Sequence, residues 1–221
     1  MIKPTKTTKA EEIFTSIKEK IINNEIKPGA RLVERSLCEY FESSRTPIRT
    51  ALQKLVSYGL AEFISSYNGV LVTHITYELI SELYDIREVL EGLAARSCAQ
   101  RIDSEGIALL DELVGKFRVH MEKGVYKDAL HEDIAIHDLV IVESRNTRLQ
   151  ELLIPVSAQS KRIVNLTEYE GEWANLTLNQ HIDIYNGIRE RKPEEAEQAM
   201  RAHIRSSRKY QLERLHRYKN L

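Results

Sequence analysis

The chain has 221 residues, of which 42% are hydrophobic and 29% charged, which is the composition of an ordinary globular protein. No uncharged apolar run approaches the roughly 20 residues of a membrane-spanning helix, the N-terminus lacks the apolar stretch of a signal peptide, and two cysteines cannot form a disulfide framework. These features predict a cytoplasmic protein without a membrane partner and exclude a small disulfide-stabilised secreted domain.

The net charge of −1 is unevenly distributed. Residues 1–74 carry 11 Lys and Arg against 8 Asp and Glu, whereas the remainder of the chain is acidic. A small basic module joined to a larger acidic one suits a DNA-binding domain attached to a second domain.

Three helices are predicted within the first 60 residues. The first covers about 9–23, where isoleucines recur at every fourth position before Pro and Gly end the pattern. Two shorter helices follow at about 34–41 and 45–57, with a tight turn at Glu42-Ser43 between them. A short helix, a tight turn and a second helix are typical of a helix-turn-helix.

A β-hairpin is predicted directly after these helices. The runs Leu60–Ser65 and Val70–His74 flank Tyr67-Asn68-Gly69, and Asn-Gly between two apolar runs favours a hairpin because both residues tolerate positive φ. Three helices followed by a hairpin are the winged form of the helix-turn-helix. We therefore expect a DNA-binding domain over residues 1–75.

From residue 76 onward only helical patterns occur. The first has a 3.6-residue apolar period, which predicts that one stripe faces the core: Leu79, Leu83, Ile86, Leu90 and Leu93. Helices are expected over about 76–100, from Asp103 to Gly124, and over about 126–143, 147–168, 173–191 and 193–218. The predicted fold is therefore mainly α, with the winged helix joined to an all-α bundle of about six helices over residues 76–221.

Arginines cluster at the start of the second helix of the helix-turn-helix, the part that enters the major groove. Ser44 is predicted to cap this helix, so that Arg45, Thr46 and Arg49 project from its first turns. Arginine reads guanine, and threonine meets phosphate or a thymine methyl. A solvated charged face would explain the arginines alone, but the helices, turn and hairpin together indicate binding to double-stranded DNA.

The same segment resembles the winged helix of the GntR family. The resemblance is carried by Pro28-Gly29-Ala30-Arg31-Leu32, Glu34, Leu37, Ser44-Arg45-Thr46-Pro47-Ile48-Arg49, Ala51-Leu52 and Gly59-Leu60. The helical remainder resembles the C-terminal (FCD) domain of the FadR subfamily. The resemblance implies a homodimeric regulator that binds a pseudo-palindromic operator, with dimerisation and effector binding in residues 76–221. It implies DNA contacts by Arg35, Ser44, Arg45, Thr46 and Arg49.

Two positions depart from the family pattern. Thr50 stands where glutamate is usual, and Tyr67-Asn68-Gly69 lacks the basic residue that is common before the glycine of the wing. The contribution of the wing to DNA binding is therefore open.

A candidate metal site lies in the helical part. Asp133 and His137 are four residues apart and share one helix face, while His181 and His203 lie on the apolar stripes of two later helices. Hydrogen-bonded core histidines are the alternative explanation. An unpaired buried aspartate is costly, however, and a divalent metal would offset that cost.

The metal-binding branch of the FadR-type domain carries Asp-x-x-x-His and two later histidines, and Asp133, His137, His181 and His203 match all four positions. The resemblance therefore implies a bound divalent ion, zinc in the first place, with nickel, iron or manganese as alternatives. One carboxylate and three neutral imidazoles would leave a positive site with open coordination positions. We expect a small organic-acid effector there, with Arg87 on a second ligand oxygen or, alternatively, in a salt bridge with Glu91 or Asp85.

Three other functions are alternatives to an effector-controlled regulator. A metal-dependent enzyme would need a general base, for which only Glu132 or Glu143 offers itself, and would have no use for a DNA-binding domain. A regulator that responds to the metal alone remains an alternative. A regulator that responds to acyl-CoA should lack the four metal-binding residues. We therefore predict a regulator, acting as a repressor, and not an enzyme.

Overall fold

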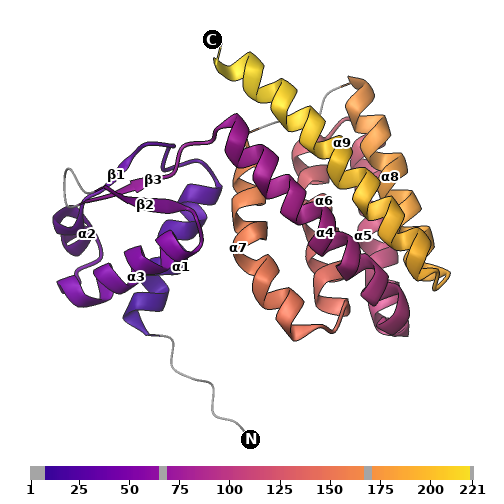
Figure 1. Cartoon of the computed structure of the whole chain (residues 1–221), viewed down its shortest axis with the longest axis horizontal. Helices are drawn as coiled ribbons and strands as arrows, with labels where there is room; N and C mark the ends of the chain where they lie inside the picture. The colour runs from indigo at the N-terminus through magenta and orange to yellow at the C-terminus, as the bar shows by residue number, and fades with distance from the viewer. Residues whose placement is uncertain (1–7, 65–68, 167–170, 220–221) are drawn as a thin grey trace, which may run out of the picture. The chain divides into compact units, whose positions relative to one another are not determined.

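The structure, a computed structural model, describes residues 8–64, 69–166 and 171–219 (Figure 1). The chain divides into two compact units, residues 1–75 with 157–166 and residues 76–156 with 167–221. The first unit thus includes a segment that the sequence assigns to the second domain, and the division at residue 75 stays a prediction. No helix within the described ranges is long and apolar enough to cross a membrane.

The first unit contains a winged helix-turn-helix, as predicted. Its helices are α1 (Lys9–Ile22), α2 (Glu34–Tyr40) and α3 (Arg45–Ser57), and its strands are β1 (Arg31–Leu32), β2 (Ala61–Ile64) and β3 (Gly69–Val72). The strands form an antiparallel sheet in the order β1-β3-β2. The sequence did not predict β1, which is only two residues long. Of the predicted turn, Tyr67 and Asn68 lie outside the described residues.

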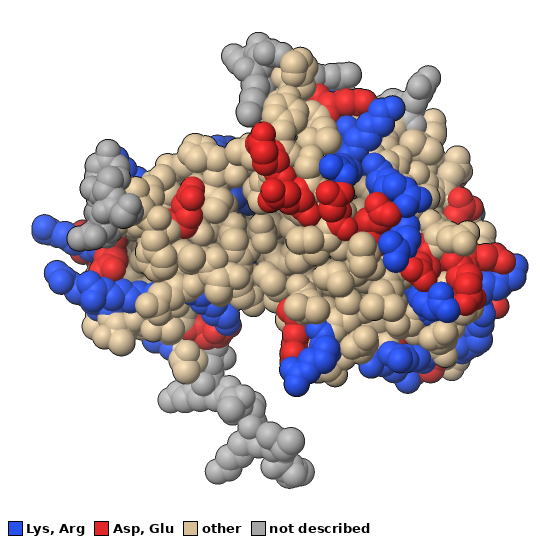
Figure 2. Space-filling model, viewed as in Figure 1, with Lys and Arg blue, Asp and Glu red and all other residues tan. Residues whose placement is uncertain are grey.

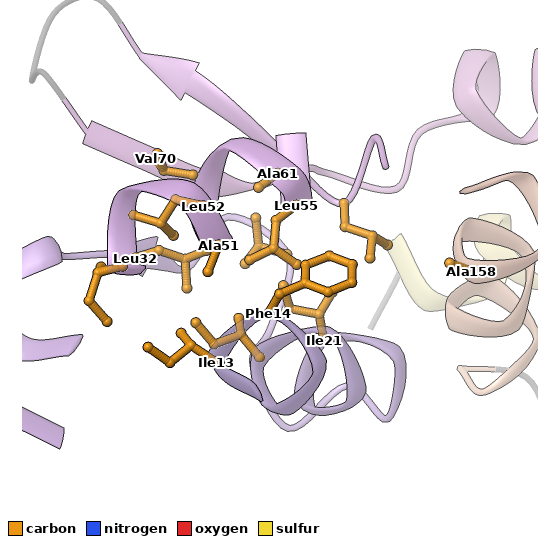
Figure 3. Close-up of a cluster of buried hydrophobic side chains, with 14 residues drawn as sticks. Ile13, Phe14, Ile21, Leu32, Ala51, Leu52, Leu55, Ala61, Val70 and Ala158 are labelled. Atoms are coloured by element: carbon orange, nitrogen blue, oxygen red, sulfur yellow. The ribbon is translucent and has the colours of Figure 1, made fainter. Parts of the chain in front are cut away.

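The core of this unit is built from the apolar faces of α1 and α3 (Figure 3). Ile13, Ile17 and Ile21 of α1 and Leu55 of α3 are at most 1% exposed, and Leu52 is 2% exposed. Gly59 follows α3 and turns the chain into β2. Its φ of +66° is a backbone conformation that residues with a side chain rarely adopt. Because α3 is anchored along this face, its opposite face, which carries Arg45 and Arg49, points to solvent.

The prediction that the Ser44 side chain caps α3 is wrong. Ser44 occupies the N-cap position with extended backbone, but its side chain makes no capping hydrogen bond. The predicted cap at Asp103 does form, because its Oδ1 accepts from the backbone N–H groups of Glu105 and Gly106. Ser44 is exposed, and its hydroxyl makes no hydrogen bond to the backbone at the start of α3.

The second unit is the predicted helical bundle. Over the residues that the structure describes, its six helices are α4 (Tyr77–Arg101), α5 (Ser104–Glu122), α6 (Tyr126–Glu143), α7 (Thr147–Val164), α8 (Gly171–Arg189) and α9 (Pro193–Lys219), with the second half of α7 in the first unit. Helix α9 runs alongside α4 over much of its length, and α4 also packs on α6 and α8 (Figure 1). One face of α4 is therefore central to the bundle.

The face of α4 that points into the bundle differs from the predicted stripe. Only Leu83 of that stripe is buried, whereas Ile86 is 48% and Leu93 39% exposed. The buried face instead carries Tyr84, Arg87, Glu91 and several small residues. Hydrophobic periodicity marked an apolar face correctly, but the neighbouring helices cover another face, which contains charged side chains.

Ion pairs join α4 to α9 along their shared edge. Glu88 pairs with Arg205 at 2.7 Å, and Arg96 pairs with Glu197 at 3.1 Å. Figure 2 shows acidic and basic side chains alternating along this line, with few charged side chains on the adjoining surface over α4. The exposed apolar side chains of α4, which are Ile86, Val89 and Leu93, therefore lie outside this line of ion pairs.

Candidate metal centre and DNA-binding groove

Four side chains with metal-binding atoms meet inside the helical unit. Asp133 and His137 come from α6, His181 from α8 and His203 from α9, and each offers one ligand atom within 4.8 Å of all the others. All four residues are at most 7% exposed. The structure therefore brings together the four residues that the sequence singled out.

The atoms that face one another in this cluster are electron-rich. Asp133 Oδ1 lies 2.8 Å from His181 Nε2, and His137 Nε2 lies 3.2 Å from His203 Nε2. Despite their proximity, Asp133 Oδ1 and His181 Nε2 do not align as a hydrogen bond, and neither has another hydrogen-bond partner among the described residues. Orphaned buried acceptors that converge on one point are the arrangement a cation requires.

The outer nitrogen of each histidine is occupied by an acceptor. His137 Nδ1 donates to Glu91 at 2.6 Å, His181 Nδ1 donates to the Thr177 carbonyl oxygen at 2.9 Å, and His203 Nδ1 lies 3.2 Å from Gln180 Oε1. A carboxylate and a carbonyl can only accept, so Nδ1 carries the proton and Nε2 presents a lone pair to the centre. Metal-bound histidines are oriented in this way.

Charge within the cluster follows from these contacts. Burial opposes ionisation of Asp133, but His181 and then His137 outweigh it and hold the pKa of Asp133 far below its usual range. For Glu91, Arg87 and then His137 outweigh burial and hold its pKa at about 2. Burial, followed by the neighbouring imidazoles, keeps the pKa of His203 well below 6.5. An ionised Asp133 and an unprotonated His203 favour a cation at the centre, whereas the charge of Glu91 is matched by Arg87.

The donor set fits a divalent transition metal. Three imidazole nitrogens and one carboxylate oxygen suit zinc, nickel, iron or manganese, and they leave further positions open on a six-coordinate ion. Such an ion would supply a positively charged site that accepts ligand oxygens. Imidazole ligands disfavour cations that prefer oxygen, and the outer acceptors orient all three imidazoles.

Arg87 takes the salt-bridge alternative that the sequence left open, because its Nε lies 2.5 Å from Glu91 Oε1. Glu91 therefore joins Arg87 to His137, one oxygen for each. Sequence reasoning noted the spacing of Arg87 and Glu91 but missed this bridge. The signal for this bridge was the pair of opposite charges, Arg87 and Glu91, four residues apart on the face of α4 that is buried.

The predicted DNA contacts lie around a groove in the first unit. The groove has a volume of about 390 Å³, and its lining includes Arg31, Arg35, Arg45 and Arg49 together with residues of the hairpin. Ser44 and Thr46 are exposed at the start of α3 but do not line it. Figure 2 shows basic side chains gathered over α2 and α3. Arg31, on β1, was not singled out from the sequence.

Two of these arginines are paired with glutamates. Arg49 Nε lies 3.0 Å from both carboxylate oxygens of Glu34, and Arg35 Nε lies 3.1 Å from Glu39 Oε1. The Arg35 pair is strongly exposed, whereas the Glu34 side chain is only 35% exposed. The arginine positions are therefore not equivalent in the absence of DNA.

Comparison with known families defines the class of protein. Residues 82–206 match the FCD domain, and residues 9–70 match the bacterial regulatory proteins of the gntR family. The chain belongs to the GntR-family transcriptional regulators that carry an FCD domain. It is a regulator and not an enzyme, as the sequence predicts.

Individual relatives agree with this assignment. The chain is 29% identical to the transcriptional regulator YdhC of Bacillus subtilis over 87% of this chain and 86% of that protein. It is 28% identical to the galactonate operon transcriptional repressor of Escherichia coli, covering 90% and 95% of the two chains. The structure of E. coli McbR/YncC superposes with a TM-score of 0.77 at 19% identity, covering 95% of this chain and all of that one, which supports the fold.

Proposed function

We propose that the protein is an operator-binding repressor of the FadR subfamily, controlled by a small carboxylate that binds at a divalent metal ion. The observation that carries this proposal is the convergence of Asp133, His137, His181 and His203 within 4.8 Å, with every imidazole oriented by an outer acceptor. The FCD domain match and the galactonate repressor among the relatives support a regulator with a ligand-binding helical domain. Zinc is the first candidate for the metal.

Arg87 is proposed as the second contact of the effector. Glu91 engages its Nε, and among the described residues no acceptor is recorded for its two terminal nitrogens. Those nitrogens form the planar fork that matches a carboxylate. A ligand with one oxygen on the metal and another carboxylate oxygen near Arg87 would use both features, which favours organic acids or sugar acids.

On the DNA side, we propose that Arg35, Ser44, Arg45, Thr46 and Arg49 contact the operator. All five are exposed in the first unit. Arg49→Ala is expected to weaken specific binding by about 1–3 kcal/mol and to flatten its salt dependence. Arg148→Ala, which removes an exposed arginine from α7, is the control. Equal operator affinity of the Arg49 variant and the native protein in a mobility-shift titration would count against this orientation of α3.

The regulatory proposal is tested on protein purified without chelator. Its operator is first selected from random duplexes, and metal content is measured for the native protein, His137→Ala and the control His120→Ala, whose ring pairs with Glu132 outside the cluster. We expect metal in the native and control proteins only. Carboxylates are then screened by thermal shift and by their effect on operator binding.

The outcomes separate the alternatives. A carboxylate that stabilises only the metal-loaded protein and changes operator affinity supports the proposal. Operator binding that follows metal concentration alone would favour a metal-responsive regulator. If no carboxylate binds the metal-loaded protein, and the metal-free and metal-loaded forms bind DNA equally, effector control at this centre is excluded.

A further inference from the structure

The groove of the winged helix contains an acidic side chain at a place where DNA binding favours basic side chains. Its lining includes Arg31, Arg35, Arg45 and Arg49, and Glu34 is the one acidic side chain among the described residues that form it. A carboxylate facing the DNA phosphates weakens binding to every sequence alike. Its presence therefore suggests a benefit other than affinity.

The geometry of the pair indicates that benefit. Glu34 begins α2, where the helix dipole favours a carboxylate, and both of its oxygens accept from Arg49 Nε at 3.0 Å. Arg49 lies in the second turn of α3, and no hydrogen bond from its terminal nitrogens is recorded among the described residues. Glu34 thus engages Nε of the guanidinium, and neither terminal NH2 group makes a hydrogen bond to it.

We infer that Glu34 is a positioning residue that orients Arg49 as an end-on reader of guanine. The two terminal nitrogens match O6 and N7 of guanine, which is the usual bidentate arginine contact in the major groove. A guanidinium held at Nε loses less rotational freedom when it meets the base, so the correct base gains more than a wrong one. This inference rests on the proposed DNA-binding function.

The test compares Glu34→Gln with Glu42→Gln, which removes the same charge from the turn between α2 and α3, where Glu42 is exposed. An operator selected by the native protein is varied one base pair at a time, and affinities are measured for each variant duplex. We expect Arg49→Ala to abolish discrimination at one G·C pair. Glu34→Gln should lower discrimination at that same pair by roughly three- to tenfold, while Glu42→Gln leaves it unchanged.

Glu34→Asp provides a second variant, because it keeps the charge but shortens the side chain and should lose discrimination as well. Three results would overturn the inference: full discrimination by Glu34→Gln, a loss at a different base pair, which would mean that Glu34 itself reads a base, or a uniform loss across all duplexes in Arg49→Ala. If the native protein enriched no sequence at all, the proposed DNA-binding function would fail, and this inference with it.

Discussion

Arg49 and Arg87 are held in the same way in two different environments. In each case Nε pairs with a glutamate, and within the described residues no hydrogen bond engages the two terminal nitrogens. The Arg49 pair is exposed and adds little to stability, so its value lies in orientation. The Arg87 pair with Glu91 is almost fully buried, so loss of either partner would leave an unpaired charge in the bundle.

Glu91→Gln is expected to weaken metal binding on the order of 10–100-fold. The amide can still accept from His137 Nδ1, but it no longer carries the charge that raises the basicity of the imidazole and holds Arg87. Metal affinity is measured by competition with a chromophoric chelator, with circular dichroism as a check on folding.

The matched control is Glu132→Gln, which changes another carboxylate that contacts a histidine, at 2.9 Å from His120 and outside the cluster. It should leave metal affinity unchanged. Equal metal affinities of the Glu91 variant and the native protein would show that Glu91 does not support metal binding. Equal losses of metal affinity in both variants would indicate a general effect of charge.

Sequence alone could predict only part of this arrangement. The spacing of Asp133 and His137 places both on one turn of α6, so their proximity is a local property of the helix. The contact between Glu91 and His137 spans 46 positions and depends on how α4 and α6 pack, which no local pattern encodes. Ser44 shows the same limit, since a capping residue was recognised but its side-chain bond was not formed.

At the scale of single elements, the cap that Asp103 forms on helix α5 should make the stability of the protein depend on pH. Its carboxylate accepts from the Gly106 backbone first and from Arg145 second, and these contacts lower its pKa below 3.8. A lowered folded-state pKa gives stability that is present above the unfolded value and lost as pH falls through the folded value. The contribution should therefore disappear below about pH 4.

Asp103→Asn keeps an oxygen acceptor at the cap but cannot titrate. We expect its thermal midpoint to lie below that of the native protein at pH 7 and to approach it between pH 4 and pH 2. Both midpoints are measured by circular dichroism at matched ionic strength. A constant difference between the two proteins across this range would show that the ionised cap does not contribute.

Gly187 allows α8 to approach the start of α9. A Cβ at this position would lie 2.8 Å from the backbone Cα and N atoms of Ala196, and backbone cannot move aside easily. We expect Gly187→Ala to destabilise the protein by about 1–3 kcal/mol, as measured by urea unfolding.

Gly115 offers the matched substitution. It lies inside α5, it is exposed, and a Cβ there would meet nothing within 4 Å. Gly115→Ala should therefore stabilise the protein by about 0.5–1 kcal/mol through helix propensity alone. Similar effects of the two substitutions would argue against close packing of α8 on α9.

The elements themselves were predictable because local signals agree with the tertiary structure. The helices of both units and the hairpin of the first unit were predicted from periodicity, from the Pro and Gly breaks and from the turn residues. The orientation of α4 was not predictable, because this helix has two faces that can be buried. The face with Arg87 and Glu91 meets the other helices of the bundle, while Ile86, Val89 and Leu93 remain exposed on the single chain.

For the whole molecule, the exposed stripe of α4 supports the proposed homodimer. Ile86, Val89 and Leu93 are spaced by three and four residues, and each is at least 39% exposed. Large apolar residues grouped on one helix face generally mark an interaction surface. A second copy of the chain is the occupant we propose, because a two-fold dimer would present two DNA-binding helices to the two halves of a pseudo-palindromic operator.

Val89→Glu is expected to convert the dimer to a monomer, because it places a charge in the centre of a closely packed apolar contact. Light scattering should give twice the chain mass of 25.6 kDa for the native protein and a single chain mass for the variant. Val142→Glu, at an equally exposed valine of α6, is the control and should remain dimeric. Affinity for the full operator should fall in the Val89 variant, while affinity for an isolated half-site should not change. A native protein that scatters as a monomer would contradict the dimer. A Val89 variant that stays dimeric would show that the exposed side chains of Ile86, Val89 and Leu93 do not form the dimer contact, which would then lie on another face.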